Sequence, residues 1–516
     1  MLLPIFLAAF ATFSTADRAC APRILKSSAK NIVCVCNATY CDDIEPVTDI
    51  PAGTAVVYSS SLSGRRFSKS TKQFSDGRGN SLVTVDVDTR KTFQTIIGFG
   101  GAITDSVGYN MNALNERTRY NLLLSYFGKN GLEYNLVRVP IASTDFSTRE
   151  YSYDDVEGDL EMKNFALTEE DLRYKIPYIT AAVKLTRGAV RLFASPWSAP
   201  GWMKTNGRMK GGGSLKGEVN GGEEDYKSYA RYLVKFFEEY AKKGVQFWGM
   251  TIQNEPSSGA LPSYGWQTMF FTSTMQRDFM KVTLGPMLKG NDVTKNLKVM
   301  GLDDNRLFLP GWADKIFNDV EAAQYVDGIG VHWYLNFLTP PSVLATTHKR
   351  HPTKFILATE ACTGSAVVHG PILGDWYRGE EYAADIITNL NNFVAGWTDW
   401  NMCLDLKGGP TWVGNYVDSP VIVNAAADEF YKQPMFYAMG HFSKFFKPGS
   451  VRISTTVAGP SQVLAAAVAF KGRTAMTLLN RLSSATTVSV NDVATGRHLD
   501  ISMEPNSIVT LLWEQN

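Results

Sequence analysis

The chain has 516 residues, of which 44% are hydrophobic and 12% aromatic. Its 51 basic and 50 acidic side chains leave a formal net charge of +1. This composition excludes a disordered chain, which would combine low hydrophobicity with high net charge. The charge balance provides no overall field that would attract nucleic acid or an anionic membrane, so no nucleic-acid partner is expected.

The first 16 residues are typical of a secretory signal peptide. The apolar run over residues 1–11 is shorter than the roughly 20 residues that span a bilayer. Small residues at positions 14–16 then precede the polar Asp17. The pattern predicts cleavage after Ala16 and passage through the secretory pathway.

The cysteine distribution agrees with an oxidising compartment. Four of the six cysteines cluster after the predicted cleavage site, at Cys20, Cys34, Cys36 and Cys41. Such a cluster predicts two disulfides rather than a zinc site, and pairing of Cys34 with Cys36 is disfavoured because both point the same way on an extended segment. Within the cluster, Asn37-Ala38-Thr39 predicts N-glycosylation of Asn37.

Eight short apolar runs, rich in branched residues, recur between residues 94 and 401, with helical patterns between most of them. The runs are Thr95–Gly101, Tyr134–Ala142, Ala189–Trp197, Phe247–Glu255, Leu297–Asp304, Val326–Tyr334, Lys354–Cys362 and Val394–Asn401. Eight strand–helix units over about 300 residues predict a (β/α)₈ barrel, with a doubly wound sheet as the alternative.

The clearest helical pattern spans residues 225–243, and a second begins at Thr168 but is interrupted by Pro177. After Pro448 five short apolar runs alternate with turn residues, and no helical pattern lies between them. These runs predict a small antiparallel β-sandwich, which the β-rich residues 47–93 could join from before the barrel.

Polar and aromatic residues gather where the predicted barrel strands end, which is where such barrels carry their active sites. Glu255 ends the fourth run and Glu360 lies near the end of the seventh, on opposite sides of the barrel. Two facing carboxylates are the minimal machinery of glycoside hydrolysis, although a single strand-end Glu would more often be a solvated loop charge. Asn254 suits a hydrogen bond to a sugar hydroxyl.

Two neighbours of Glu360 have expected roles. Arg138 could hold the Glu360 carboxylate ionised, and Tyr334 could orient it. The six histidines offer no metal-ligand spacing beyond His348 and His351, which lie in an apparent loop. The Gly98–Gly101 turn lacks the continuation of a phosphate-binding motif. The sequence therefore predicts neither a metal nor a cofactor.

Nine motifs in order resemble the lysosomal acid β-glucosidases of glycoside hydrolase family 30. They are Cys34–Cys41, Gly98–Asp105, Ala194–Trp197, Lys204–Asn206, Gly213–Gly217, Asn254–Pro256, Val331–Tyr334, Gly396–Asn401 and Lys432–Tyr437. The resemblance spans Cys20 to about Trp513. It departs from the family pattern at Gln253 and Trp266, where Glu and Phe are expected, and this affects the expected shape of the aglycone site only.

The resemblance implies a retaining β-glucosidase that cleaves glucosylceramide at acidic pH, with Glu255 as acid/base and Glu360 as nucleophile. It implies disulfides Cys20–Cys34 and Cys36–Cys41. The residues implied to hold the glucose are Asp105, Trp197, Asn254, Trp400 and Asn415, joined by Arg138 and Tyr334; those implied near the aglycone are Tyr264 and Trp266, again with Tyr334.

The resemblance also implies a lysosomal, peripherally membrane-associated enzyme. Its partners would be a saposin C-like activator, anionic phospholipid and a lysosomal integral membrane protein as sorting receptor. The implied domains are a signal peptide (1–16), a small antiparallel β-domain (17–46 plus 402–433), a β-sandwich (47–93 plus 449–516) and the catalytic barrel (94–401 plus 434–448).

Two other functions compete with this interpretation. A secreted β-1,6-glucanase or xylanase-like hydrolase would share the same fold. A carbohydrate- or lipid-binding relative without catalysis would need one of the two carboxylates to be missing, whereas both Glu255 and Glu360 are present.

Overall fold

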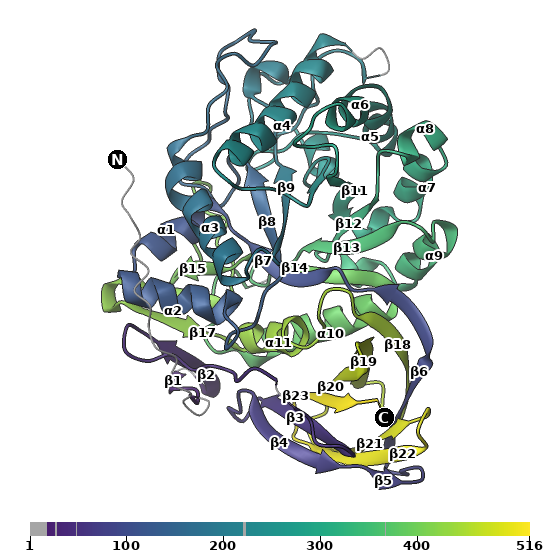
Figure 1. The fold of residues 1–516 in the computed structure, drawn as a ribbon. Helices are drawn as coiled ribbons and strands as arrows, with labels where there is room; N and C mark the ends of the chain where they lie inside the picture. Colours follow the sequence, from purple (N-terminus) through teal and green to yellow (C-terminus); the bar gives the residue numbers. More distant parts are fainter. Residues whose placement is uncertain (1–17, 26–27, 48, 220–222, 367, 516) are drawn as a thin grey trace.

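The computed structural model describes residues 18–515 apart from 26–27, 48, 220–222 and 367, so the predicted signal peptide lies outside the described residues. The described strands form a closed eight-stranded barrel, a ten-stranded sheet and a five-stranded sheet. In Figure 1 the ten-stranded sheet lies below the barrel, and strands β2 (Ser28–Cys36) and β17 (Glu429–Lys432) of the five-stranded sheet lie at the lower left of the barrel, below α2 (Glu116–Phe127). In the described part of the chain no helix is both long and apolar enough to cross a membrane.

The barrel strands are parallel, and the barrel closes where β14 pairs with β7. They are β7 (Gly98–Ala102), β8 (Leu136–Ile141), β9 (Arg191–Pro196), β10 (Gly249–Thr251), β11 (Lys298–Asn305), β12 (Gly328–His332), β13 (Phe355–Glu360) and β14 (Val394–Asn401). Each predicted run overlaps one strand, which confirms the (β/α)₈ barrel. The runs could be recognised in the sequence because parallel strands are covered on both faces and therefore form continuous apolar segments.

Helices surround the barrel. They are α1 (Asp105–Asn112), α2 (Glu116–Phe127), α3 (Ile176–Leu185), α4 (Glu224–Lys242), α5 (Ser273–Phe279), α6 (Gly285–Lys289), α7 (Gly311–Phe317), α8 (Val320–Ala323), α9 (Ser342–Arg350), α10 (Trp376–Asn391) and α11 (Pro434–Ser443). Helix α4 matches the pattern predicted at 225–243. The helix expected to begin at Thr168 does begin there, because Glu169 and Glu170 are helical and the Leu172 N–H donates to the Thr168 carbonyl. It continues through a π-helical turn, Asp171–Lys175, into α3, where Pro177 lies in the first turn and its missing N–H is tolerated.

The ten-stranded sheet combines strands from before and after the barrel. They are β3 (Thr54–Ser61), β4 (Ser68–Gln73), β5 (Ser75–Asp76), β6 (Val83–Thr95), β18 (Val451–Ala458), β19 (Val463–Phe470), β20 (Arg473–Asn480), β21 (Thr486–Asp492), β22 (Arg497–Met503) and β23 (Ser507–Glu514). The expected sandwich is confirmed, but not its purely antiparallel pairing, because β21 runs parallel to β6. Strands β20 and β21 are consecutive in the chain but do not pair. The chain crosses the sheet between them, so that β21 lies beside β6 and runs in the same direction.

The small sheet has the order β1-β2-β17-β16-β15. Its strands are β1 (Pro22–Leu25), β2 (Ser28–Cys36), β15 (Cys403–Asp405), β16 (Val421–Asn424) and β17 (Glu429–Lys432). All pairs are antiparallel except β15 with β16. The disulfides Cys20–Cys34 and Cys36–Cys41 both form, as the resemblance implied. Asn37 lies in the turn after β2, where its Oδ1 accepts bonds from the Thr39 N–H and hydroxyl, and its glycosylation stays a prediction.

Candidate active site

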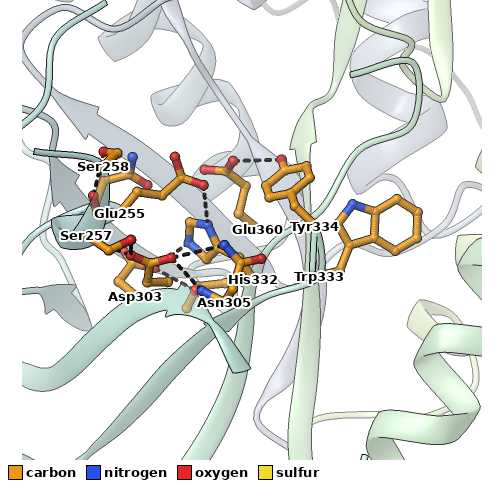
Figure 2. Close-up of polar contacts among 12 residues, drawn as sticks. Glu255, Ser257, Ser258, Asp303, Asn305, His332, Trp333, Tyr334 and Glu360 are labelled. Atoms are coloured by element: carbon orange, nitrogen blue, oxygen red, sulfur yellow. Dashed lines mark hydrogen bonds and ion pairs between the residues drawn. The ribbon is translucent and has the colours of Figure 1, made fainter. Parts of the chain in front are cut away.

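Glu255 and Glu360 face each other at the carboxyl end of the barrel (Figure 2). Glu360 is the last residue of β13. Glu255 lies in the turn after β10, and its backbone N–H donates to the Asp303 carbonyl at 2.9 Å. The Glu255 backbone is left-handed, at φ 41° and ψ 57°, a conformation that side-chain-bearing residues adopt rarely. One carboxylate oxygen of each residue lies within 4.8 Å of the other.

Arg138 contacts Glu360 and Asn254, the residue before Glu255, from the barrel interior, where its side chain is fully buried. Its guanidinium pairs with Glu360 Oε2 and Asp303 Oδ2, and it donates to Asn254 Oδ1 and Ser195 Oγ. The planar guanidinium therefore fixes the carboxylate of Glu360 and the amide of Asn254 in one geometry.

The second oxygen of Glu360 accepts a 2.7 Å bond from the Tyr334 hydroxyl (Figure 2), so both of its carboxylate oxygens are held. Burial raises the pKa of Glu360, the nearby charge of Glu255 adds to this rise, and the positive charges of His332 and Arg138 oppose it. Its expected partners, Arg138 and Tyr334, are thus both in contact with it.

His332 lies below the carboxylate pair and contacts two acids at once (Figure 2). Its Nδ1 lies 3.2 Å from Glu255 Oε1, and its Nε2 lies 2.9 Å from Asp303 Oδ1. Burial lowers its pKa, but the negative charges of Glu360 and Asp303 outweigh burial and raise the pKa to about 10. The ring is therefore an imidazolium throughout the acidic and neutral range.

Charged side chains surround the two glutamates. Arg138 and His332 are cations, and the charges of these two hold the pKa of Asp303 well below its ordinary value against the effect of burial. The imidazolium of His332 contacts Glu255, and the guanidinium of Arg138 pairs with Glu360. One carboxylic acid and one carboxylate facing each other can donate a proton and attack in the same step.

Two groups of side chains in the described residues have metal-ligand spacing. In the first, Glu255, His332 and Glu360, the imidazolium offers no lone pair to a metal. In the second, Cys36 and Cys41 are joined in a disulfide. Hydrogen bonding and oxidation therefore account for both clusters.

Aromatic rings form one wall of the site. Trp197 and Trp400 are stacked with ring centroids 5.1 Å apart and an interplanar angle of 20°. Arg138 lies over both rings, at 4.9 and 5.5 Å from their centroids. Trp266 and Tyr334 pack against the same cluster. Flat aromatic faces of this kind suit the C–H faces of a sugar ring.

Asp145 is a site residue that the sequence analysis missed. It is buried in the loop after β8, and Asn415 Nδ2 donates to its Oδ2 at 2.8 Å. Burial raises its pKa to about 7, helped by the charges of Glu360 and Glu255, so it lies close to the carboxylate pair. The available signal was its position shortly after a predicted strand, the same signal that selected Asp105.

Asp105 is not brought together with the glutamates by any of its described contacts. As the first residue of α1, it accepts hydrogen bonds from Ser147 Oγ and Tyr151 OH, at 2.5 and 2.9 Å, and lies 3.6 Å from the ammonium of Lys175. These contacts support the loop that carries Asp145. Its role in holding glucose stays a prediction.

Two of the three residues predicted near the aglycone, Tyr264 and Trp266, follow the short helix η4 (Pro256–Ala260). The Tyr264 hydroxyl donates to Glu255 Oε2 at 3.3 Å. The Tyr264 and Trp266 rings meet edge-on with centroids 4.7 Å apart. Both therefore lie on the side of the site that Glu255, the acid/base candidate, occupies; we call this the acid side.

The raised pKa of Asp145 predicts greater stability at acidic pH. Because its pKa is about 7 in the fold against 3.8 ordinarily, its proton-linked stabilisation is complete below about 4 and is lost as pH rises through 7. The stabilisation from His332, whose pKa rises from 6.5 to about 10, is lost over a higher pH range. We expect the thermal unfolding midpoint to fall from pH 5 to pH 8, and Asp145→Asn to reduce that fall.

The matched control is Asp76→Asn, because Asp76 is exposed in β5, an edge strand of the ten-stranded sheet and not of the barrel. Calorimetry or circular dichroism at both pH values should show the same fall for this control as for the unmodified chain. An Asp145→Asn variant whose midpoint falls equally would contradict the assigned pKa.

Comparison with known proteins places this geometry in a family. The model of the glycosyl hydrolase family 30 TIM-barrel domain matches residues 96–446, and that of the family 30 beta sandwich domain matches residues 449–511. The chain is 53% identical over 500 residues to "Putative glucosylceramidase 3" of Caenorhabditis elegans, covering 96% of this chain and 95% of that protein. It is 43% identical over 518 residues to mouse lysosomal acid glucosylceramidase, covering 100% and 99%.

Among solved structures, SrfJ from Salmonella typhimurium superposes with a TM-score of 0.82 at 26% sequence identity. The superposition covers 90% of this chain and 100% of SrfJ. The likeness thus includes the accessory β-structure as well as the barrel.

Proposed function

The chain belongs to glycoside hydrolase family 30, and from that premise we propose that it is a retaining β-glucosidase that hydrolyses glucosylceramide to glucose and ceramide. The full-length similarity to the mouse glucosylceramidase supports this substrate. The observation that carries the mechanism is the facing pair of Glu255 and Glu360 with oxygens within 4.8 Å. Retaining enzymes hold their carboxyl groups about 5–5.5 Å apart, whereas inverting enzymes need about 6.5–9.5 Å to admit a water.

In the first step, Glu360 attacks the anomeric carbon while Glu255 donates its proton to the glycosidic oxygen. The bond to ceramide breaks, ceramide leaves as an alcohol, and a glucosyl ester forms on Glu360. The His332 imidazolium, 3.2 Å from Glu255, stabilises the carboxylate that proton donation leaves behind.

In the second step, the ionised Glu255 takes a proton from water, and the water oxygen attacks the anomeric carbon. The ester to Glu360 breaks, and glucose leaves with the β configuration of the substrate. Arg138 and Tyr334 hold both oxygens of Glu360, so the departing carboxylate returns to its starting position.

Several neighbours of the pair are suited to hold the glucose. Trp197 and Trp400 provide an aromatic wall, and the linked Asp145 and Asn415 provide polar groups beside it. Because Arg138 occupies the Asn254 oxygen, the Asn254 amide nitrogen remains to donate to the sugar 2-hydroxyl. That bond would strengthen as charge develops in the transition state.

An apolar rim on the barrel mouth suits a substrate embedded in a membrane. We define the apolar rim as Leu307, Phe337 and Leu338, whose exposed fractions are 44%, 81% and 59%. They lie on the short helices η6 (Arg306–Phe308) and η7 (Asn336–Leu338), which follow β11 and β12. Arg306 Nη2 joins the two helices by donating to the Asn336 and Thr339 carbonyls.

We expect the double substitution of Phe337 and Leu338 by Ser to reduce binding to glucosylceramide-containing liposomes with anionic phospholipid about a hundredfold or more, because burial of each side chain in lipid is worth roughly 1.5–3 kcal/mol and about 1.4 kcal/mol corresponds to tenfold. Turnover of the liposomal substrate should fall with binding. Turnover of a soluble aryl β-glucoside should change less than about twofold, since the rim does not contact the carboxylates.

Val320→Ser provides the control for the apolar rim. Val320 is 81% exposed, like Phe337, but it begins α8 on the segment leading into β12, away from the barrel mouth. Equal losses on liposomal and soluble substrates, or the same loss of binding in Val320→Ser, would refute interfacial action by the rim.

The proposed site of action is the lysosomal lumen, with the enzyme attached peripherally to membranes. The signal-peptide pattern, the two disulfides and the similarity to a lysosomal relative support it. A saposin C-like activator, anionic phospholipid and a lysosomal integral membrane protein as sorting receptor are proposed partners on the same basis.

The test of the function is hydrolysis by purified protein at pH 5 of glucosylceramide, β-1,6-glucan and xylan. We expect glucosylceramide to be the preferred substrate, and proton NMR to show β-glucose as the first product. Preference for either polysaccharide would favour the competing hydrolase interpretation, and α-glucose appearing first would exclude the retaining mechanism.

A further inference from the structure

Two loops form the mouth beside the acid side of the site. The first, residues 201–217, follows β9, and the second, residues 256–272, follows β10 and carries Tyr264 and Trp266. Their backbones pair: Gly211 N donates to the Trp266 carbonyl at 2.9 Å, and Phe270 N donates to the Gly213 carbonyl at 2.8 Å. We call them the mouth loops.

Lys204 lies between the mouth loops with its side chain fully buried. Its ammonium donates to three backbone carbonyls, those of Met209, Gly211 and Thr268, at 2.8, 3.2 and 2.6 Å. Three N–H donors therefore meet three acceptors, two on the first mouth loop and one on the second. A buried carbonyl left without a donor is costly, so loss of the ammonium would weaken this loop pairing.

The carbonyl that Lys204 holds on the second loop is close to the acid/base candidate. The Thr268 hydroxyl lies 2.5 Å from Ser258 Oγ, which donates to the Glu255 carbonyl at 2.7 Å. On the same loop, Tyr264 contacts the Glu255 carboxylate directly. A shift of the second loop away from the first would therefore move the wall that faces the leaving group.

We propose that Lys204 is a positioning residue whose ammonium holds the mouth loops together and thereby makes the fit of a long aglycone depend on its protonation. This inference rests on the proposed β-glucosidase function. It assigns to Lys204 no contact with the reacting atoms.

The electrostatic surroundings support a change near neutral pH. Burial lowers the pKa of Lys204 to about 7; the charge of Glu150, on the loop after β8, raises it, and that of Arg208, on its own loop, lowers it. Glu150 also faces Lys210, and the titratable group of the second loop is Tyr264, whose pKa is raised far above neutrality. Lys204 is thus protonated at pH 5, with three N–H donors for three carbonyls. At pH 8 the neutral amine has only two N–H donors for the same three carbonyls.

The experiment compares two soluble substrates with the same sugar, octyl and methyl β-glucoside. The quantity compared is kcat/KM for octyl β-glucoside divided by kcat/KM for methyl β-glucoside. Titration of the carboxylate pair affects both substrates alike, so it cancels in this ratio. We expect this ratio in the unmodified enzyme to be constant from pH 5 to 6 and to fall about tenfold by pH 8, as one charge-assisted hydrogen bond is lost. Lys204→Met should give a low ratio that does not change with pH.

Lys204→Arg stays charged, so its ratio should remain at the high acidic value up to pH 8. Lys216→Met is the control, because Lys216 is an exposed lysine of the same mouth loop and its variant should follow the unmodified pH dependence. A ratio in the unmodified enzyme that stays constant to pH 8 would overturn the proposal even if the variants did not fold. So would a Lys204→Met variant that follows the unmodified pH dependence. Failure to cleave glucosylceramide would instead refute the proposed function, because the alkyl glucosides test Lys204 separately.

Discussion

Replacement of Glu360 by Gln is expected to lower turnover of every β-glucoside by about 10⁴-fold or more, because the amide cannot form the glucosyl ester. The loss should not depend on the leaving group, since no aglycone removes the need for a nucleophile. Arg138 and Tyr334 contact both positions of the side-chain terminus, so the amide should fit without disturbing the fold. Steady-state rates on glucosylceramide and on activated aryl β-glucosides provide the measurement.

Glu133→Gln is the control for this variant. Glu133 precedes β8 and pairs with Lys444 and Lys447, away from the carboxylate pair. Its substitution should leave turnover near that of the unmodified enzyme. A Glu360→Gln variant retaining more than about a hundredth of the activity would remove Glu360 from the nucleophile role.

Replacement of Glu255 by Gln is expected to have an effect that depends strongly on the leaving group. Ceramide is a poor leaving group that needs protonation, so glucosylceramide turnover should fall about 10²–10⁴-fold. An activated phenol needs little protonation, so the glucosyl-enzyme should still form and the attack of water should limit the rate. A plot of log kcat/KM against leaving-group pKa should therefore steepen relative to the unmodified enzyme.

Azide distinguishes this assignment from its reverse. In Glu255→Ala with an activated substrate, azide should attack the glucosyl-enzyme without general-base help, restore part of the rate and yield β-glucosyl azide. If Glu360→Gln showed the steeper leaving-group dependence instead, the two roles would have to be exchanged.

The fold could be predicted where burial dictates sequence pattern. The barrel strands are covered on both sides, so runs such as Phe355–Glu360 stand out as apolar segments. The parallel pairing of β6 with β21 could not be predicted, because it joins residues 83–87 to residues 488–492 and depends on long-range packing. The π-helical turn before α3 likewise has no local sequence signal.

Site residues at the ends of strands could be predicted from the sequence. Site residues on loops that return to the barrel were missed in part. Glu360 and Tyr334 follow directly from strand ends, and the structure joins them. Asp105 and Asp145 lie three and four residues beyond the ends of β7 and β8, and only the tertiary fold separates them, since Asp105 begins a helix and Asp145 lies beside the carboxylate pair. Asp303 was passed over because a buried acid within an apolar strand shows its partners, Arg138 and His332, only in three dimensions.

The arrangement of the ten-stranded sheet has a consequence for synthesis of the chain. Strand β6 ends at Thr95, yet its partner β18 begins at Val451, and β3 pairs with β23, which ends at Glu514. During translation the edges of β3 and β6 therefore wait unpaired until the whole barrel and then the carboxyl terminus have emerged. Unpaired edges of this kind promote aggregation, and non-local pairing folds slowly. Premature termination before β23 would leave β3 and β20 without their shared neighbour, so completion of this sheet depends on residues Ser507–Glu514.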